Sequence, residues 1–222
     1  MIRFCNLCNF PIVKINASVF GLRCIKCRSS FIHRAMGKVL DGIKLDDNAY
    51  VHEFSKHGAI YNYLRKRFKC LTTSEYFDNV ASGEIVNGVQ CQDLQMLSFA
   101  NNSYDLFTST EVFEHVPDDA KGFSEIYRCL KPGAYFVFTV PINEVPETVE
   151  RAKIEKGEIV HMLEPEYHGD HLRSKGILAF RNYGLDIKVK LEKSGFINVQ
   201  LHLIEDAKHG IVPAKRVVSC QK

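Results

Sequence analysis

The sequence lacks an apolar run long enough to cross a membrane. Its longest apolar stretch, around residues 134–142, is far shorter than the roughly 20 residues that a membrane helix needs. Residues 1–10 also lack the apolar core of a signal peptide, so we expect a cytoplasmic protein with no membrane partner. Of its 222 residues, 45% are hydrophobic and 25% are charged. This composition excludes disordered and fibrous classes and allows one ordinary core with a small appendage.

Acidic residues are missing from the first 40 positions. This segment has no aspartate or glutamate and seven basic residues: Arg3, Lys14, Arg23, Lys26, Arg28, Arg34 and Lys38. The whole chain has 29 basic and 26 acidic residues, so the positive excess belongs to this segment. Either the segment docks on a polyanion such as RNA, or its charge offsets that of a metal–thiolate centre. We favour the second interpretation, because only Phe10, Phe20 and Phe31 offer rings for base stacking.

Four of the eight cysteines form two CxxC pairs near the N-terminus. Cys5 and Cys8 make the first pair, Cys24 and Cys27 make the second, and 15 residues lie between the pairs. This spacing predicts a zinc ribbon over residues 1–30, in which four thiolates enclose a structural Zn2+ and leave no open coordination position. So short a segment buries little apolar surface, and metal binding would supply roughly 10–16 kcal/mol toward folding it. The alternative is buried or redox cysteines with coincidental spacing. Ordinary buried thiols are predicted for Cys70, Cys91, Cys129 and Cys220.

Residues 104–141 read as a strand, an acidic turn, an amphipathic helix and a second strand. Polar residues crowd the carboxyl end of the first strand and continue through Glu111, Glu114 and His115. Apolar residues then recur with helical spacing at Phe123, Ile126, Tyr127 and Leu130. An apolar run at 134–140 is typical of a strand that is covered on both faces. The order predicts a parallel βαβ unit in the middle of a doubly wound sheet, with ligand-binding groups at its first turn.

This block also carries a family resemblance. The run DLFTSTEVFEHVPDD, the LKPG turn and the FVFTVP strand resemble the fourth and fifth strands of class I S-adenosylmethionine-dependent methyltransferases of the small-molecule type. The resemblance implies an α/β fold over residues 47–222, with a mostly parallel seven-stranded Rossmann-like sheet of order 3-2-1-4-5-7-6. Residues 31–46 are then a linking helix after the ribbon. Residues 142–172 are an insertion that lies over the cofactor edge as a lid.

Glycine is scarce where this family has its cofactor loop. After the strand expected at 49–54, the sequence continues as Ser55-Lys56-His57-Gly58, so only one of several glycines remains. Glycines let backbone N–H groups approach a ligand closely. The resemblance assigns Glu53, Ser55 and Gly58 to an S-adenosylmethionine site, with Ser55 in place of the first glycine. Taken alone, the segment is an ordinary strand-to-helix turn.

Further candidate cofactor residues follow the expected strand ends. Glu75 ends a strand at 70–75 and lies 22 residues after Glu53, near the interval of about 20 at which Rossmann-like folds place an acid for the ribose hydroxyls. The resemblance assigns Asp93 and Leu94 to the adenine, and it places Glu111 beside the methionine portion. The alternatives are a solvated glutamate for Glu75 and a turn-forming aspartate for Asp93.

Titratable side chains gather in the expected lid. They are His161, Tyr167, His168, Asp170 and His171. A second metal site is an alternative for this group, but the sequence lacks the i, i+4 histidine spacing of zincins. For an oxygen acceptor, His115, His168 and Asp170 are the candidate catalytic residues, as general base or as its orienting partner. The alternative for His115 is a histidine that shapes the pocket.

Three functional classes follow from these residues. The leading hypothesis is an S-adenosylmethionine-dependent methyltransferase that acts on a hydroxyl of a small-molecule or sugar-type acceptor. The second is a methyltransferase of RNA or another polyanion that docks through the basic ribbon, which we do not favour. The third is a non-catalytic binding protein in which the glycine-poor loop at 55–58 no longer holds the cofactor.

Overall fold

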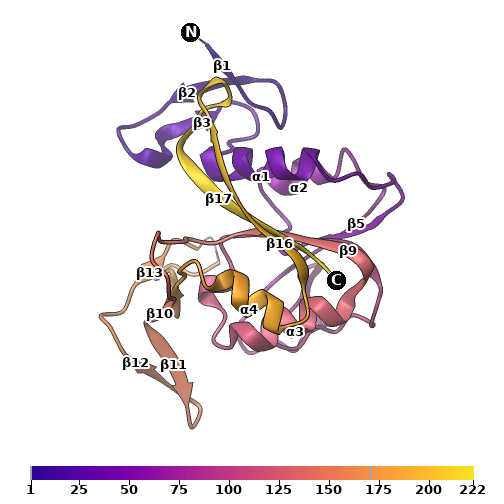
Figure 1. The fold of residues 1–222 in the computed structure, drawn as a ribbon, viewed down its shortest axis with the longest axis vertical. Coiled ribbons are helices and arrows are strands. Elements are labelled where there is room, and N and C mark those ends of the chain that lie inside the picture. The colour runs from indigo at the N-terminus through magenta and orange to yellow at the C-terminus, as the bar shows by residue number, and fades with distance from the viewer. Residues whose placement is uncertain (1, 171) are drawn as a thin grey trace.

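The computed structural model describes residues 2–170 and 172–222, and its centre is an eight-stranded sheet (Figure 1). The strand order is β16-β17-β9-β8-β4-β5-β7-β6. The pairs from β9 to β7 are parallel, whereas β17, β16 and β6 pair antiparallel. The strands are β4 (Tyr50–Glu53), β5 (Cys70–Glu75), β6 (Ile85–Val86), β7 (Val89–Cys91), β8 (Tyr104–Thr110), β9 (Leu130–Thr139), β16 (Ile197–Asp206) and β17 (Ile211–Gln221). When the short edge strand β6 is left out and the other seven strands are numbered in chain order, they lie in the order 3-2-1-4-5-7-6. Strand β6 is the eighth strand, at one edge of the sheet.

Two helices cover each face of the sheet (Figure 1). The helices α1 (Phe31–Asp41) and α2 (Ala59–Leu64) pack on one face, and α3 (Asp119–Cys129) and α4 (Ile187–Lys193) pack on the other. Strand side chains alternate between the two cores, as Val137 joins the first and Phe136 and Phe138 join the second. This double burial confirms the doubly wound, Rossmann-like sheet that the apolar run of β9 predicted.

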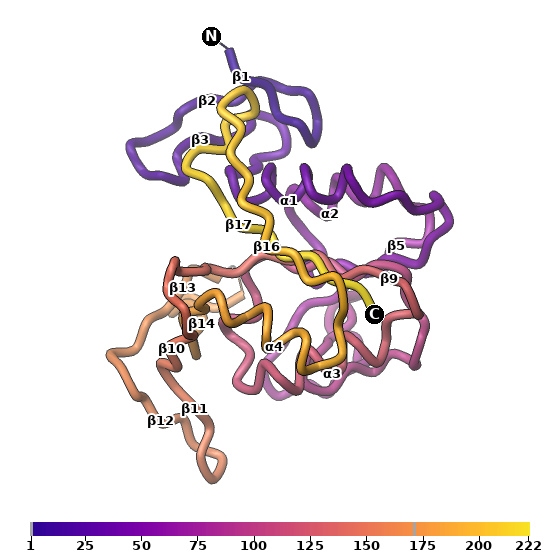
Figure 2. Tube along the Cα trace, in the orientation of Figure 1, coloured from indigo at the N-terminus to yellow at the C-terminus, as the bar shows by residue number. Residues whose placement is uncertain are grey.

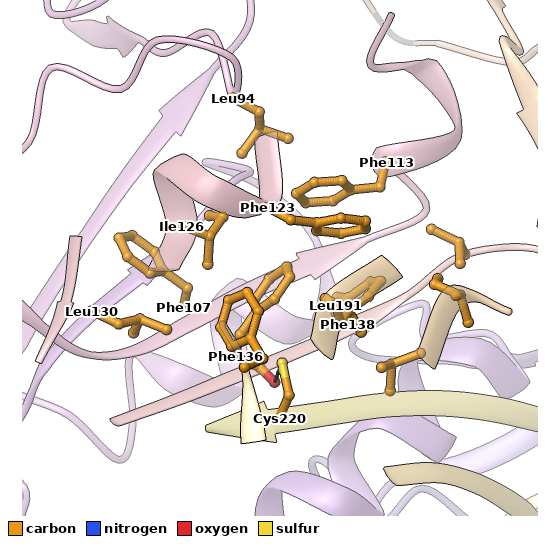
Figure 3. Packing of buried hydrophobic residues seen from close by; sticks show 14 of the residues in the cluster. Leu94, Phe107, Phe113, Phe123, Ile126, Leu130, Phe136, Phe138, Leu191 and Cys220 are labelled. Carbon is orange, nitrogen blue, oxygen red and sulfur yellow. Dashed lines mark hydrogen bonds between the residues drawn. The ribbon is translucent and has the colours of Figure 1, made fainter. Parts of the chain in front are cut away.

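The α3 face is packed largely with phenylalanine (Figure 3). The rings of Phe113 and Phe123 stack at 4.5 Å, and those of Phe136 and Phe138 stack at 4.4 Å. The Asp118 side chain begins α3 by accepting a hydrogen bond from the Lys121 N–H at 3.0 Å. Two contacts therefore fix the turn before α3: the Asp118 cap and the stacking of the Phe113 and Phe123 rings.

Helix boundaries differ from the sequence pattern at two places. Helix α2 has only six residues and ends at Leu64, although the sequence has apolar residues at helical spacing at Ile60, Leu64 and Phe68. Hydrogen bonds of the Arg67 guanidinium to the Leu40 and Ile43 carbonyls hold the following turn in place. Helix α3 ends at Cys129, so that Leu130 already belongs to β9.

The N-terminal module packs against α1 and the β16–β17 hairpin of the sheet (Figure 2). Its strands β1 (Arg3–Phe4), β2 (Pro11–Lys14) and β3 (Leu22–Cys24) form a small antiparallel sheet, with the turn η1 (Val19–Gly21) before β3. Leu7 and Ile12 join the same apolar cluster as α1 and β17. At Gly37 of α1, an added Cβ would lie 2.2 Å from the Leu7 side chain, so this glycine permits the contact.

A buried arginine joins three parts of the molecule. Arg34 of α1 is fully buried and donates hydrogen bonds to the carbonyl oxygens of Ser29 (2.5 Å), Leu22 (3.1 Å) and Gly210 (2.9 Å). Ser29 and Leu22 belong to the N-terminal module, while Gly210 lies at the tip of the β16–β17 hairpin, after η3 (Ala207–His209). The module, α1 and this hairpin therefore share one polar junction.

The insertion after β9 is built from short antiparallel strand pairs. These are β10 (Val149–Glu150) with β15 (Arg181–Asn182), β11 (Ala152–Glu155) with β12 (Glu158–His161), and β13 (Tyr167–His168) with β14 (Ile177–Leu178). Buried Arg181 donates to the backbone oxygens of Val116 and Pro117 at 2.5 and 2.7 Å. This anchors the insertion beside the segment that follows β8. No helix in the described part of the chain is long and apolar enough to span a membrane.

Candidate active site

A cavity of about 550 Å³ lies at the carboxyl ends of the central parallel strands. Its sheet side is formed by residues that follow β4, β5, β7 and β8, and its other wall comes from the insertion. The sequence-predicted residues among its lining are Ser55, Glu75, Asp93, Leu94, Glu111, His115 and Asp170. This is the edge at which open α/β sheets bind ligands.

Glu75 organises the glycine-poor loop. Its Oε1 accepts a hydrogen bond from the Lys56 N–H at 2.9 Å and lies 3.2 Å from the Ser55 hydroxyl. The Ser55 hydroxyl also accepts from the His57 N–H at 3.3 Å. The side-chain oxygens of Glu75 and Ser55 therefore accept hydrogen bonds from two backbone N–H groups of the turn. The small Ser55 side chain is part of the cavity lining.

Two predicted cofactor residues do not line the cavity. Gly58 precedes α2 as its N-cap with a φ of +101°, a conformation that favours glycine. A Cβ added at this position would have no atom within 4 Å. Glu53 is only 2% exposed and accepts a hydrogen bond from the Thr108 hydroxyl. Burial, with the nearby Glu75 charge, raises the pKa of Glu53 to about 8. Neither residue is part of the cavity lining, and their assignment to the cofactor stays a prediction.

Asp93 lines the cavity and also forms a turn, which is the alternative role that the sequence allowed. Its Oδ1 accepts the Gln95 N–H at 2.8 Å, which makes a turn after β7. The Ser82 hydroxyl lies 2.7 Å from the Asp93 N–H and accepts from it. The turn presents Asp93 and Leu94 to the cavity together.

Glu111 lies at the end of β8 in the left-handed region, with φ of +54°. This is an uncommon conformation for a residue with a side chain, and such strain concentrates at functional sites. Its N–H donates to the Thr139 carbonyl at 2.8 Å, and its carboxylate pairs with Lys215 of β17 at 2.9 Å. The carboxylate therefore sits at the cavity wall with a fixed position and a partner behind it.

Glu114, His115 and His168 converge at the boundary between η2 (Phe113–His115) and the insertion. His115 Nε2 and His168 Nδ1 each lie 3.7 Å from Glu114 Oε1. Burial raises the pKa of Glu114 to about 7 and lowers that of His115 to about 4. The pKa of His168 is raised, chiefly because the Glu114 carboxylate is close. His115 lines the cavity, whereas Glu114 and His168 lie behind it.

The insertion closes the cavity through an arginine clamp. Arg173 pairs with both oxygens of the Asp78 carboxylate, at 2.8 and 3.0 Å, and also contacts Asp170. Its guanidinium lies over the Tyr76 ring, 5.5 Å from the centroid. His161 is exposed on β12, away from the cavity lining, and the predicted His171 lies outside the described residues.

The four N-terminal cysteines form a compact cluster with free thiols. The sulfur atoms lie within 4.8 Å of one another, with Cys5 to Cys27 at 3.7 Å and Cys8 to Cys24 at 3.4 Å. A tetrahedral ion with about 2.3 Å bonds to sulfur would separate its ligands by about 3.8 Å, so the cluster is compatible with a zinc site. Hydrogen bonding from Cys5 lowers the pKa of Cys27 to about 4, while the pKa of Cys5 is raised.

The two cysteine pairs have the same backbone geometry. In each, the first cysteine's N–H donates to the carbonyl five residues later, at 2.9 Å for Cys5 and 3.2 Å for Cys24. The residue after each second cysteine is left-handed, Asn9 with φ of 58° and Arg28 with φ of 57°. The sequence is therefore folded into two equivalent turns that face each other.

Residues 55–138 match the family described as a methyltransferase domain. The fold is that of the S-adenosylmethionine-dependent methyltransferases. A structure of such an enzyme from Mesorhizobium loti superimposes with a TM-score of 0.55 at 18% identity, covering 85% of this chain and 98% of the other. A Burkholderia thailandensis 1,6-didemethyltoxoflavin-N1-methyltransferase, solved with bound 1,6-didemethyltoxoflavin and S-adenosylhomocysteine, superimposes with a TM-score of 0.53 at 15% identity, covering 86% of this chain and 78% of the other.

A curated relative extends the similarity to sequence. The 24-methylenesterol C-methyltransferase 2 of Arabidopsis thaliana is 30% identical over 145 residues, which is 62% of this chain and 37% of the relative. The chain thus spans little more than a third of that protein's length. The methyltransferase match covers the loop at residues 55–58 and residues 104–138 of the βαβ block, but not the N-terminal cysteines or the insertion.

Sequence reasoning missed several residues around the cavity. Tyr76, Asp78 and Arg173 have no motif of their own, although Tyr76 directly follows the predicted ribose acid. Ile154 and Ile159 add an apolar wall from the β11–β12 hairpin. Glu114 does have a sequence signal, because it belongs to the acidic turn after the first strand of the βαβ block. That signal predicts no role for its carboxylate.

Proposed function

We propose that the protein is an S-adenosylmethionine-dependent methyltransferase that acts on a hydroxyl of a small-molecule or sugar-type acceptor. The observation that carries this proposal is the convergence of Ser55, Glu75, Asp93 and Glu111 on one cavity, opposite His115 and Asp170. These residues come from four strand ends and the insertion. A volume of about 550 Å³ is within the usual range for cavities that bind small ligands.

The cofactor would occupy the sheet side of the cavity. Glu75 would accept hydrogen bonds from the ribose hydroxyls, which suits a carboxylate with two acceptor oxygens. Asp93 would accept from the adenine amino group, with the Leu94 N–H beside the ring. Glu111, held by Lys215, would lie near the methionine portion. Ser55 would border the cofactor from the cavity lining, whereas Glu53 and Gly58 flank the loop outside the lining.

The acceptor would bind between Glu111 and the insertion. Methyl transfer forms a bond from the acceptor oxygen to the methyl carbon while the carbon–sulfur bond breaks, and the electron pair of that bond stays on sulfur. The acceptor proton passes to the groups at this end of the cavity, His115, Asp170 and, behind them, His168. Alignment of the two reactants can supply about 7–11 kcal/mol of the barrier reduction, and the arginine clamp encloses them.

The N-terminal module would hold a structural Zn2+ through Cys5, Cys8, Cys24 and Cys27. Their spacing and the two equivalent turns support this assignment. A four-thiolate site has no open coordination position, so the ion would stabilise the module and take no part in catalysis.

Docking of a polyanion on the module is less favoured by the contacts of its basic residues. Arg34 is buried in the polar junction, Lys38 pairs with Asp206 at 2.7 Å, and Arg3 donates to the Ala207 carbonyl at 2.9 Å. These three cations are engaged within the molecule. The non-catalytic alternative is less favoured because Ser55 and Glu75, which are hydrogen-bonded to each other, both line the cavity.

Calorimetric titration of the full chain with S-adenosylmethionine and S-adenosylhomocysteine tests the cofactor assignment. We expect both to bind, and we expect Glu75→Ala to lose roughly 1.5–3 kcal/mol, the value of a hydrogen bond to a charged group, or about 10- to 150-fold in affinity. Glu75→Gln keeps an oxygen for the Lys56 N–H and separates loop order from ribose binding.

The matched control is Glu158→Ala, at an exposed position of β12. Wild-type affinity in Glu75→Ala would remove the ribose role. Absence of binding by the wild-type chain would overturn the enzyme proposal as a whole. The acceptor class is then tested by methyl transfer to hydroxyl, amine and carbon acceptors, and transfer only to nitrogen or carbon would refute the hydroxyl assignment.

A further inference from the structure

Glu114 is a buried carboxylate whose oxygens have no hydrogen-bond partner in the part of the chain that the structure describes. Its side chain is 1% exposed, and neither Oε1 nor Oε2 has a partner among the described residues. Burying a carboxylate in this state is costly. Native structures compensate such groups with a cation, a bound water or a proton, so the surroundings of Glu114 indicate what the site is built to hold.

Two histidine nitrogens face this carboxylate from different elements. His115 Nε2 comes from η2, and His168 Nδ1 comes from β13 of the insertion, each 3.7 Å from Glu114 Oε1. The three candidate ligand atoms all lie within 4.8 Å of one another. The imidazole rings are nearly perpendicular, with an interplanar angle of 85°, so that they approach a common point from two directions.

The opposite nitrogen of each histidine is already engaged. His115 Nδ1 lies 2.8 Å from the Leu178 carbonyl oxygen and donates to it, which leaves Nε2 with a free lone pair. His168 Nε2 lies 3.2 Å from Glu166 Oε1, which leaves Nδ1 for the centre of the cluster. Metal-binding histidines characteristically donate their second N–H to a carbonyl or carboxylate in this way.

We propose that Glu114, His115 and His168 bind a divalent transition-metal ion. Two imidazoles and one carboxylate suit zinc, manganese, iron(II) or cobalt(II), and three protein ligands leave open coordination positions. Bonds of about 2.0–2.2 Å would place the ligand atoms roughly 3.0–3.5 Å apart. The two separations of 3.7 Å from Glu114 Oε1 would shorten by a few tenths of an ångström. The two histidine nitrogens, which lie within 4.8 Å of each other, would also approach each other.

The location of this ion gives it a role in the proposed methyl transfer, and that role rests on the proposed function. His115 is part of the cavity lining, next to Val116 and Asp170. An acceptor hydroxyl bound at an open position would have its pKa lowered by the ion. With the ion bound, the histidines would not accept the proton, which would leave to water in place of the route through His115 and His168. The oxygen would form a bond to the methyl carbon as the carbon–sulfur bond breaks, and the electron pair of that bond would stay on sulfur. The two histidines would then act as ligands.

Titration of the full chain with Mn2+, followed by the electron paramagnetic resonance signal of the free ion, tests the site directly. Mn2+ prefers oxygen and nitrogen ligands, so the four thiolates of the N-terminal module do not compete. We expect about one ion to bind per wild-type chain. Glu114→Gln and His168→Ala should each abolish binding or weaken it by more than the positioning variant does. That variant, Glu166→Gln, should weaken it about 10- to 100-fold.

His161→Ala is the matched control, because this histidine also lies in the insertion but is exposed on β12. It should bind Mn2+ like the wild type. A wild-type chain that binds no Mn2+, Co2+ or Zn2+ outside the thiolates, or variants that bind like His161→Ala, would overturn the proposal. Thermal melting of each variant shows that it is folded, and Glu114→Gln preserves the shape of the side chain.

Failure of the metal site and failure of the proposed function give different results. If S-adenosylmethionine binds and methyl transfer is unchanged after the ion is removed by a chelator, the catalytic role of the ion is wrong and the methyltransferase stands. If the ion binds but S-adenosylmethionine does not, the metal site stands and the proposed function is wrong.

Discussion

Glu53 occupies the last position of β4, where the sheet and the aromatic core enclose its carboxyl group. The Thr108 hydroxyl is its hydrogen-bond donor, and burial raises its pKa to about 8 from a usual value near 4.5. The folded state therefore holds this proton over a pH range in which the unfolded chain has lost it. Stability gained in this way is complete below the unfolded pKa and is lost as pH rises toward the folded pKa.

We predict that Glu53→Gln removes a pH dependence of stability. Between about pH 5 and 8, wild-type unfolding free energy should fall relative to the variant by up to roughly 1.4 kcal/mol per pH unit, the slope for one proton. Urea unfolding at several pH values measures the difference. Glu158→Gln, on the exposed β11–β12 hairpin, should run parallel to the wild type. Parallel curves for Glu53→Gln as well would mean that Glu53 ionises normally.

At the scale of the elements, the insertion meets the sheet through a firm base and a lighter clamp. Arg181 fixes the base with hydrogen bonds to buried carbonyls, whereas Arg173 joins the rim to Asp78, whose side chain is 60% exposed. Exposed ion pairs contribute only about 0–1 kcal/mol. The rim can therefore open while the base stays in place.

We predict that Arg173→Ala speeds ligand exchange without destabilising the fold. Hydrogen exchange in residues 165–178 should rise, and S-adenosylmethionine should dissociate faster, while the melting temperature changes little. Arg173→Lys should behave in an intermediate way, because lysine cannot pair with both oxygens of Asp78. The control is Lys153→Ala, whose pair with Glu155 lies within the β11–β12 hairpin. An unchanged dissociation rate in Arg173→Ala would show that the clamp does not gate the cavity.

The sequence was most informative where each element has a regular pattern and least informative in the insertion. Strand β5 runs from Cys70 to Glu75 as predicted, and it contains the β-branched residues Thr72 and Thr73, which favour strands. The insertion's two-residue strands are too short to show a period of two. Contacts such as Arg173 with Asp78 join residues 95 positions apart, and no local pattern encodes them.

The candidate site was predictable in part for the same reason. Glu75, Asp93 and Glu111 follow strand ends, so parallel topology alone brings them to one edge. Glu53 ends β4 and is buried, and Gly58 is exposed at the start of α2, so that neither residue lines the cavity. The meeting of Glu114 with His168 depends on how the insertion folds back, which the sequence does not reveal.

At the scale of the whole molecule, the N-terminal module and the sheet share one hydrophobic cluster. Leu7 and Ile12 pack with α1 and β17, and Arg34 adds its three hydrogen bonds across the same boundary. Loss of order in the module would therefore expose part of the α1 face of the sheet. The metal centre would stabilise the chain well beyond its own 30 residues.

We predict that purified protein holds zinc in the four-thiolate cluster and that removing it lowers the melting temperature of the whole chain. Cys27→Ser should lose this zinc, as measured by elemental analysis and thiol titration, and should melt earlier in a single transition. Cys70→Ser, at the half-buried start of β5 and outside the cluster, should retain both properties. Equal zinc content and equal melting in the two variants would refute the zinc assignment.

The contact between the module and the β16–β17 hairpin also orders events in time. Arg3 meets Ala207 across 204 positions of sequence, and Arg34 meets Gly210 across 176. After the N-terminal module has been synthesised, the ribosome must still add more than 170 residues before the β16–β17 hairpin, against which the module packs, is complete. During that interval contacts within the first 41 residues can form, among them the turns around the cysteines and the packing of Leu7 against Gly37 of α1. Metal capture would thus come first in the life of each chain, and closure of the module on the sheet would be among the last steps of its folding.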